Sequence, residues 1–256
     1  MRLSSPFVRI PLVVDATRIA VEVDALPDRV WRPHPEGAPG NSAVPLVARD
    51  GDPDDDRAFG MMRSTPHLER LPYTRRVLAA LDSVIGRSRL MRIEEEGELG
   101  AHVDTNYYWR DHLRVHVPVH TSPAVRFTCE GESVHMGPGE VWVFDTWRPH
   151  SVINPADAAR VHLVVDTVGG VPLWNLIDAP EREPVAVAVD GPEPTIPTET
   201  VNRPWVMSPW ELEHALTAIA DELMATEPEL GRRLRSVTVD HTRAWRNLWA
   251  RYGDAP

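Results

Sequence analysis

The chain contains no lysine, because all 27 of its basic residues are arginines. Without a lysine amine it cannot form the Schiff base of a lysine aldolase or of a pyridoxal-phosphate enzyme. P-loop NTPases and protein kinases are also excluded, since both place a lysine on the nucleotide phosphates. Any anion that this protein binds must therefore be held by arginine, histidine or backbone amides.

Cysteine and long hydrophobic runs are equally scarce. Cys129 is the only cysteine, which excludes an internal disulfide, a CxxC site and a cysteine-ligated zinc or iron–sulfur centre. We expect it to be a small buried residue on a strand. No segment reaches the roughly 18 apolar residues of a membrane span. Arg9 interrupts the apolar stretch near the amino terminus, which makes a poor secretory signal. We therefore expect a cytoplasmic protein.

The remaining composition is that of an ordinary globular protein. Hydrophobic residues make up 42% of the 256 residues and charged residues 25%, as in typical folded domains. The length suits one domain with an appended segment. A net charge of −11 argues against nucleic acid or an anionic membrane as the main partner.

Short β-like runs separated by turn residues fill residues 1–172. Their number favours a mainly β sandwich, jelly roll or barrel. Two segments show helical spacing instead: Ala16–Leu26, which follows Asp15 as an N-cap, and Tyr73–Ile85. The predicted strands are Phe7–Val14, Ser42–Arg49, Arg89–Glu94, Leu113–His120, Val125–Cys129, Glu140–Asp145 and Val161–Thr167.

The sequence changes character over residues 173–256. Seven prolines from Pro180 to Pro209 predict a linker with little regular structure. Ser208 and Glu211 form the pattern of a capping box, so a helix should begin there. A last helix is expected near Asp240–Tyr252. We expect these helices to form an appendage that packs on the β domain and offers a surface for homo-oligomers.

Three potential metal ligands stand within the β region. His102 and Asp104 are two residues apart, and side chains at that spacing share one face of a strand. His150 would come from a neighbouring strand. Two histidines and one carboxylate form the facial triad of non-haem iron(II) oxygenases. The same ligand types serve zinc hydrolases, so they alone do not identify the metal.

A strict alternation marks residues 112–120 as the wall of a site. One face would carry the valines and Leu113, and the other the polar residues His112, Arg114, His116 and His120. Arg160 and His162 share one parity of the last predicted strand. An arginine on a mostly apolar strand is costly to bury without an anionic partner, and a carboxylate ligand would supply one.

These residues belong to longer stretches that resemble the aspartyl/asparaginyl β-hydroxylase family of iron(II)/2-oxoglutarate oxygenases. The matching stretches are RIEEEGELGAHVDTNYYWRDHLRVHVPVHTSP, MGPGEVWVFDTWRPHSVINP and ARVHLVVD. Together they contain, in order, the patterns HxD, RxH, GExWxFDxxxxHxVxN and RxHLVxD. The resemblance is close from about Leu71 to Gly170 and implies a double-stranded β-helix, a cupin-like jelly roll, with flanking helices.

The resemblance also implies a role for each matching residue. His102, Asp104 and His150 would hold Fe(II). Arg160 would pair with the C5 carboxylate of 2-oxoglutarate, an anchor that some related oxygenases make with lysine. Two further cofactor-binding residues are implied: His116 beside the C1 carboxylate, and Arg114 facing a carboxylate of co-substrate or substrate.

The implied activity is hydroxylation of an unactivated carbon of an amino acid, free, in a peptide or carrier-bound, with release of succinate and CO2. Asp104 separates this chain from animal members of the family, which lack the metal-binding carboxylate and act on folded domains. Arg114, Tyr107, Tyr108 and Trp109 are candidates for the substrate pocket. Two alternatives remain open: a cupin-like zinc isomerase or hydrolase without 2-oxoglutarate, and a non-catalytic ligand-binding β domain.

Overall fold

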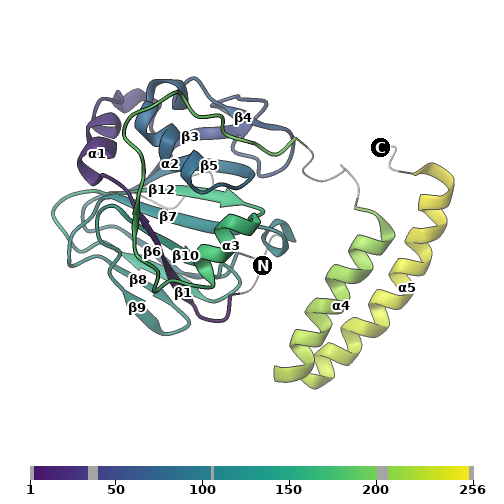
Figure 1. The fold of residues 1–256 in the computed structure, drawn as a ribbon. Coiled ribbons are helices and arrows are strands. Elements are labelled where there is room, and N and C mark those ends of the chain that lie inside the picture. The colour runs from purple at the N-terminus through teal and green to yellow at the C-terminus, as the bar shows by residue number, and fades with distance from the viewer. Residues whose placement is uncertain (1–2, 34–39, 105–106, 201–206, 254–256) are drawn as a thin grey trace. The chain divides into compact units, whose positions relative to one another are not determined.

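The computed structural model describes residues 3–33, 40–104, 107–200 and 207–253, coloured along the chain in Figure 1. The chain forms two compact units, Met1–Val201 and Asn202–Pro256. The sequence prediction ended the β domain at residue 172, whereas the first compact unit continues to Val201.

Two β-sheets form the first unit (Figure 1). The larger has the strand order β13-β1-β10-β7-β12-β5-β3-β2, with β4 paired to β3, and the smaller has the order β6-β11-β8-β9. The strands are β1 (Phe7–Val13), β2 (Arg32–Pro33), β3 (Asn41–Arg49), β4 (Met62–Ser64), β5 (Ile85–Ile93), β6 (Glu98–His102), β7 (Leu113–His120), β8 (Arg126–Cys129), β9 (Glu132–Val134), β10 (Glu140–Phe144), β11 (His150–Ile153), β12 (Arg160–Thr167) and β13 (Val185–Ala186).

Eight consecutive strands, β5 to β12, form a double-stranded β-helix. Four of them make the antiparallel order β10-β7-β12-β5 in the large sheet, and the other four make β6-β11-β8-β9 in the small sheet. Apart from the β8–β9 hairpin, the chain crosses from one sheet to the other at every step. The predicted cupin-like fold with flanking helices is therefore confirmed.

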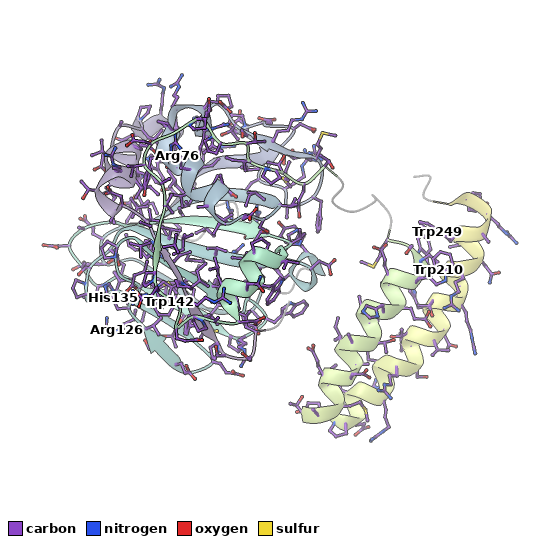
Figure 2. All side chains as sticks on the ribbon, in the orientation of Figure 1. Arg76, Arg126, His135, Trp142, Trp210 and Trp249 are labelled. Atoms are coloured by element: carbon purple, nitrogen blue, oxygen red, sulfur yellow. The ribbon has the colours of Figure 1, made fainter. Side chains whose placement is uncertain are left out.

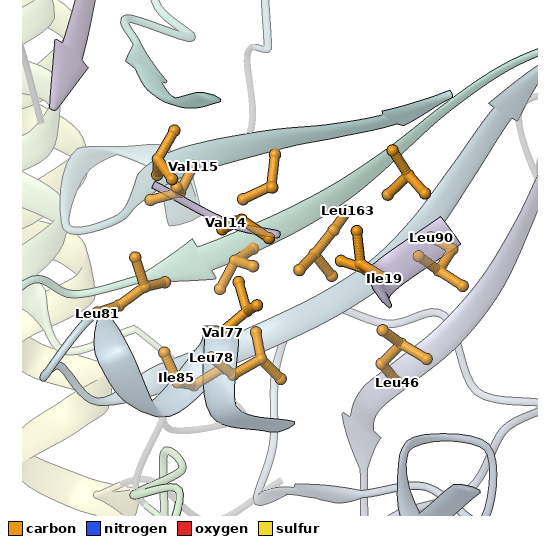
Figure 3. Close-up of a cluster of buried hydrophobic side chains, with 14 of the residues drawn as sticks. Val14, Ile19, Leu46, Val77, Leu78, Leu81, Ile85, Leu90, Val115 and Leu163 are labelled. Carbon is orange, nitrogen blue, oxygen red and sulfur yellow. The ribbon is translucent and has the colours of Figure 1, made fainter. Parts of the chain in front are cut away.

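Three helices pack on the outer face of the large sheet. They are α1 (Ala16–Asp24), α2 (Pro72–Ala80) and α3 (Val171–Ile177), and short 3-10 turns occur at Asp28–Val30, Leu68–Arg70 and Tyr107–Arg110. Asp15 caps α1 through its side chain, as predicted. The helices bury the main hydrophobic core against the sheet, which Figure 3 shows around Val77, Leu90, Val115 and Leu163.

Strand β7 confirms the predicted alternation. Val115 and Val117 belong to the core beneath the helices, whereas Arg114 and His116 line a cavity between the two sheets. The polar face of this strand is thus turned into the β-helix and away from solvent. A second, smaller core fills part of the same space, and Cys129 is fully buried in it, as expected.

Helix α2 is shorter than predicted. The helical spacing of apolar residues continues to Ile85, but the helix ends at Ala80. Asp82 then adopts a positive φ of 44°, which a continuing right-handed helix does not allow. Ile85 consequently begins strand β5. Ile85 is buried because it lies in the sheet, so its apolar character wrongly extended the predicted helix.

Part of the proline-rich segment is fixed to the β domain. Among the described residues of this segment the only strand is the two-residue β13, in agreement with the prediction of little regular structure. The backbone of Glu199 nevertheless forms hydrogen bonds with two strands of the β domain. Its amide donates to the carbonyl of Ile85 in β5, and its carbonyl accepts from the amide of Met62 in β4. The Glu199 side chain is buried, with 4% exposure. The segment therefore contributes a charged residue to the interior.

The second unit is a pair of helices, α4 (Pro209–Thr226) and α5 (Pro228–Tyr252). Ser208 and Glu211 form the predicted capping box. Near one end of the pair the rings of Trp210 and Trp249 meet edge to face with centroids 6.4 Å apart (Figure 2). Among the residues that the structure describes, no helix is long and apolar enough to cross a membrane.

Helix α5 begins twelve residues earlier than the predicted start at residue 240. Gly231 lies in the unpredicted part, and a Cβ there would come within 2.8 Å of the Met224 backbone nitrogen on α4. Close packing between the helices thus requires glycine at a position where glycine weakens a local helix signal.

Candidate metal centre

The end of β6 and the start of β11 bring three potential metal ligands together. His102 is the last residue of β6, and its register partner His150 is the first residue of β11. Asp104 follows the end of β6, and its amide donates to the Thr146 carbonyl. One ligand atom from each of these residues lies within 4.8 Å of the others. The sequence expectation that they converge is confirmed, although Asp104 lies beyond the strand.

Backbone carbonyls fix which ring nitrogen each histidine offers. The Nδ1 atom of His102 lies 2.9 Å from the Gly100 carbonyl, and Nδ1 of His150 lies 2.9 Å from the Arg148 carbonyl. A carbonyl only accepts, so each Nδ1 must carry the proton, and each Nε2 keeps a free lone pair. Both rings are therefore prepared to bind a metal ion through Nε2.

Arg114 orients the carboxylate of Asp104, the acidic residue among the three potential metal ligands. Its Nη1 donates to Oδ2 of Asp104 at 3.1 Å, and its Nε donates to Oδ1 of Asp166 at 3.0 Å. Oδ1 of Asp104 faces Nε2 of His102 at 3.8 Å. One oxygen of Asp104 is thus engaged by arginine, and the other is directed toward the histidines.

Burial sets the charge states around this group. It lowers the pKa of His150 to about 4, partly offset by the hydrogen bond to the Arg148 carbonyl and by Asp104. His150 is therefore neutral at pH 7, as a metal ligand must be. Burial also opposes the charge on Arg114, but Asp166 and Asp104 outweigh it and raise the pKa of the guanidinium.

A cavity between the two sheets contains this site. Most of the surface of its wall is apolar, and its charged or ionisable groups are three arginines and three histidines. The lining residues are Asn41, Met91, Arg92, Ile93, Leu99, His102, Arg114, His116, Phe127, Phe144, His150, Val152 and Arg160. A mostly apolar pocket with a few converging polar groups is the usual form of a small-molecule site.

Arg160 is a buried cation at this cavity. Its exposed fraction is 3%, and burial lowers the pKa of its guanidinium to about 9. Its Nη2 donates to Nδ1 of His162 at 2.7 Å. Within the described part of the chain no carboxylate pairs with it, and its Nε has no hydrogen-bond partner. A buried cation in this state favours an anionic ligand.

His116 lies beside Arg160 on the neighbouring strand. Its Nδ1 is 3.3 Å from Nδ1 of His162, and its ring meets Phe127 and Phe144 edge to face. Burial, followed by the charges of Arg160 and Arg114, lowers its pKa well below the usual value. Arg160, His116 and Arg114, which the resemblance placed near the co-substrate carboxylates, therefore all line this cavity.

The residues predicted to line a substrate pocket have varied surroundings. Trp109 is buried, and the Arg114 guanidinium lies 4.0 Å above its ring. Tyr108 is also buried and stacks on His112 at 3.6 Å between ring centroids. The side chain of Tyr107 lies outside the described part of the chain. A role of these residues toward substrate stays a prediction.

Two interior carboxylates were not singled out from the sequence. Asp166 pairs with Arg114, and Glu199 Oε1 lies 2.5 Å from Nε2 of His112. Asp166 is the last residue of the RxHLVxD pattern and shares the parity of Arg160, so that signal was available. Glu199 stands among prolines far along the chain, and no local pattern marks it.

Comparisons with known proteins agree with this geometry. A family model described as aspartyl/asparaginyl β-hydroxylase matches residues 19–169. The L-proline cis-4-hydroxylase of Rhizobium meliloti (strain 1021) is 30% identical over 105 residues, which are 40% of this chain and 38% of that protein. The L-proline cis-3-hydroxylase 2 of Streptomyces sp is 28% identical over 137 residues, covering 48% and 45%. The chain thus spans less than half the length of these curated relatives.

Among solved structures, a 2OG-Fe(II) oxygenase family oxidoreductase from Burkholderia pseudomallei is similar at a TM-score of 0.45 and 16% identity. That match covers 62% of this chain and 81% of the other.

Proposed function

The chain belongs to the aspartyl/asparaginyl β-hydroxylase family, and we propose that it is an iron(II)- and 2-oxoglutarate-dependent dioxygenase that hydroxylates an amino acid. The observation that carries the proposal is the convergence of His102, Asp104 and His150 within 4.8 Å, at a cavity that is also lined by Arg160, whose guanidinium pairs with no carboxylate among the described residues.

The three ligands fit iron(II) by their chemistry. Two neutral imidazoles and one carboxylate are the donor set of the facial triad, which leaves three coordination positions open. The hydrogen bonds of both Nδ1 atoms to carbonyls leave Nε2 for the metal. Arg114 engages one oxygen of Asp104, so we expect this carboxylate to bind through the other oxygen alone.

The cavity wall fits 2-oxoglutarate, a dianion with two separated carboxylates. Arg160 would pair with the distal carboxylate, because it is a buried cation for which the described residues provide no anion. His116 lines the same cavity and would lie near the carboxylate next to the keto group. Arg114 is already paired with Asp104 and Asp166, so its role would be to position the metal ligand.

When bound, iron and 2-oxoglutarate supply the oxidation: 2-oxoglutarate becomes succinate and CO2, one oxygen atom of O2 enters succinate and the other enters a substrate C–H bond. The protein would contribute positioning and the exclusion of water. Phe127, Phe144 and Val152 form the apolar wall beside His150, so a substrate carbon held there would be shielded from solvent.

The proposed substrate is an amino acid, free or within a peptide or carrier-bound intermediate, hydroxylated beyond its α carbon. L-proline is the first compound to test, because the two relatives described above are named for hydroxylating it. Arg114 bonds to Asp104 and lies over the Trp109 ring, so we expect these two residues to contact such a substrate.

Succinate release across free amino acids, with mass spectrometry of the products, tests the proposal. We expect one or more amino acids to increase succinate formation and to give a product 16 daltons heavier. A protein that binds zinc as purified and converts no 2-oxoglutarate with added iron would instead support the cupin-like hydrolase or isomerase. A protein that binds no metal would support a non-catalytic binding domain.

A further inference from the structure

His162 lies behind the two side chains that face the co-substrate site. Its Nδ1 is 2.7 Å from Nη2 of Arg160 and 3.3 Å from Nδ1 of His116. Arg160 and His116 line the cavity, whereas His162 does not and is 1% exposed. One nitrogen atom therefore contacts both of the residues that would bind 2-oxoglutarate.

The hydrogen-bonding capacity of arginine fixes the proton on His162. A guanidinium only donates, so Nδ1 of His162 must be an acceptor and the proton of the neutral ring must lie on Nε2. The second contact to the same Nδ1 is attractive only if His116 donates from its own Nδ1. Nε2 of His116 then carries the lone pair, and among the described residues it has no hydrogen-bond partner.

The protein environment is consistent with two neutral rings. Burial is the main cause that lowers the pKa of both histidines well below the usual value, and the charge of Arg160 is the next cause for each. With both rings neutral, Arg160 Nη2 and His116 Nδ1 can share one acceptor. The donors of Arg160 that His162 does not use include Nε, which has no partner in the described chain.

We propose that His162 is a positioning residue for the co-substrate: its Nδ1 holds Arg160 and His116 in the orientations that 2-oxoglutarate requires. The inference rests on the proposed function, in which these two residues bind the carboxylates. Without the shared acceptor, the guanidinium and the imidazole would each lose an orienting bond and gain rotational freedom. The co-substrate would then have to order both on binding.

Two amide substitutions distinguish a hydrogen-bond acceptor at the position of His162 Nδ1 from a polar side chain that places its acceptor elsewhere. The amide oxygen of asparagine occupies about the position of histidine Nδ1, whereas that of glutamine reaches toward the position of Nε2. His162→Asn should keep the acceptor that Arg160 and His116 share, and His162→Gln should lose it. We expect Gln to weaken 2-oxoglutarate binding about tenfold, since bonds to charged groups are the stronger class, and Asn to change it less than about threefold.

Calorimetric titration of 2-oxoglutarate into Mn(II)-loaded protein measures the affinity for 2-oxoglutarate without turnover. Mn(II) affinity should be unchanged in both variants, because His162 makes no described contact with His102, Asp104 or His150. An unchanged Mn(II) affinity also shows that the variants are folded. Equal 2-oxoglutarate affinities for the Asn and Gln variants would overturn the proposal. Absence of 2-oxoglutarate binding to the wild-type protein would instead contradict the proposed function.

A measurement on the unmodified protein tests the arrangement even if a variant does not fold. Nitrogen-15 NMR of the histidine rings distinguishes the two neutral tautomers. We expect His162 to carry its proton on Nε2 and His116 to carry its proton on Nδ1. A His162 ring protonated on Nδ1 would overturn the proposal, because that atom could not then accept from Arg160.

Discussion

Arg114 donates a hydrogen bond to Oδ2 of Asp104 at 3.1 Å and leaves Oδ1 facing the histidines. Asp166 accepts a second hydrogen bond, from Nε of the same guanidinium. The metal-binding carboxylate is thus oriented by a buried arginine that is itself oriented by a second buried carboxylate. Such partners of metal ligands often affect affinity strongly.

Replacing Arg114 should therefore weaken metal binding. In Arg114→Met, Asp104 would lose its orienting donor, and we expect Mn(II) affinity to fall by about 10- to 100-fold. Titration of the metal-free protein with Mn(II) measures the change. His120→Gln is a matched control on the same strand and parity, because His120 pairs with Asp24 near the surface. Unchanged Mn(II) affinity in Arg114→Met would show that Asp104 needs no support.

Arg160 should bind the co-substrate without stabilising the free protein. Its charge is buried without a carboxylate partner among the described residues, so Arg160→Met should leave the ligand-free protein at least as stable. The same change should weaken 2-oxoglutarate binding on the order of 100-fold, since a buried charge pair is broken.

Arg89 provides the comparison for this prediction. It is equally buried on the adjacent strand β5, but it pairs with Asp56. Arg89→Met should therefore lower the free energy of unfolding, because it leaves Asp56 without its partner. Thermal unfolding with and without 2-oxoglutarate measures both effects. Marked destabilisation by Arg160→Met would contradict the view that Arg160 binds a ligand carboxylate and does not stabilise the ligand-free protein.

Stability of the metal-free protein should fall as the pH drops from about 6.5 toward 4. Burial lowers the pKa of His150 to about 4 and those of His116 and His162 well below the usual value. Below about pH 6.5 the unfolded chain binds protons on these residues that the folded chain does not bind. Each adds a slope of about 1.4 kcal/mol per pH unit well below pH 6.5.

Urea unfolding at several pH values between 5 and 7.5 measures this slope. Asp55 and Asp166 have lowered pKa values, so their stabilisation is lost only below about pH 4 and these two carboxylates add little to the slope in this range. His162→Asn should reduce the slope by one proton. A free energy of unfolding that stays constant from pH 7 to pH 5 would show that these histidines are not neutral in the folded protein.

Glu199 should be important for stability despite its position in the proline-rich segment. It is buried against His112, and Glu199→Ala would break this pair and lower the free energy of unfolding by about 3 kcal/mol. Glu193→Ala is the control in the same segment, since the Glu193 side chain is 71% exposed where it pairs with Arg75 and should contribute little to stability. Equal stabilities of the two variants would mean that the His112–Glu199 contact adds nothing.

Local patterns predicted much of the fold and the centre of the site. The alternation over residues 113–120 gave the bounds of β7, and the HxD spacing with His150 gave the three converging ligands. Both signals depend on side-chain parity along one strand, which a sequence displays directly. The capping box at Ser208 is local in the same way.

Features that depend on distant contacts were not predictable in this way. The early start of α5 depends on Gly231 packing against α4. The interior position of Glu199 depends on pairing with β4 and β5. The bonds of Arg114 to Asp104 and Asp166 join it to residues 10 and 52 positions away, which no local pattern displays.

The most direct test of the account is the visible charge-transfer absorption that 2-oxoglutarate produces when it chelates protein-bound Fe(II) without oxygen. It requires the metal, the co-substrate and the triad together, and it needs no knowledge of the substrate. We predict the band for the wild-type protein and its loss in Asp104→Ala. An iron-loaded wild-type protein without the band, or an Asp104→Ala variant that retains it in full, would contradict the assignment.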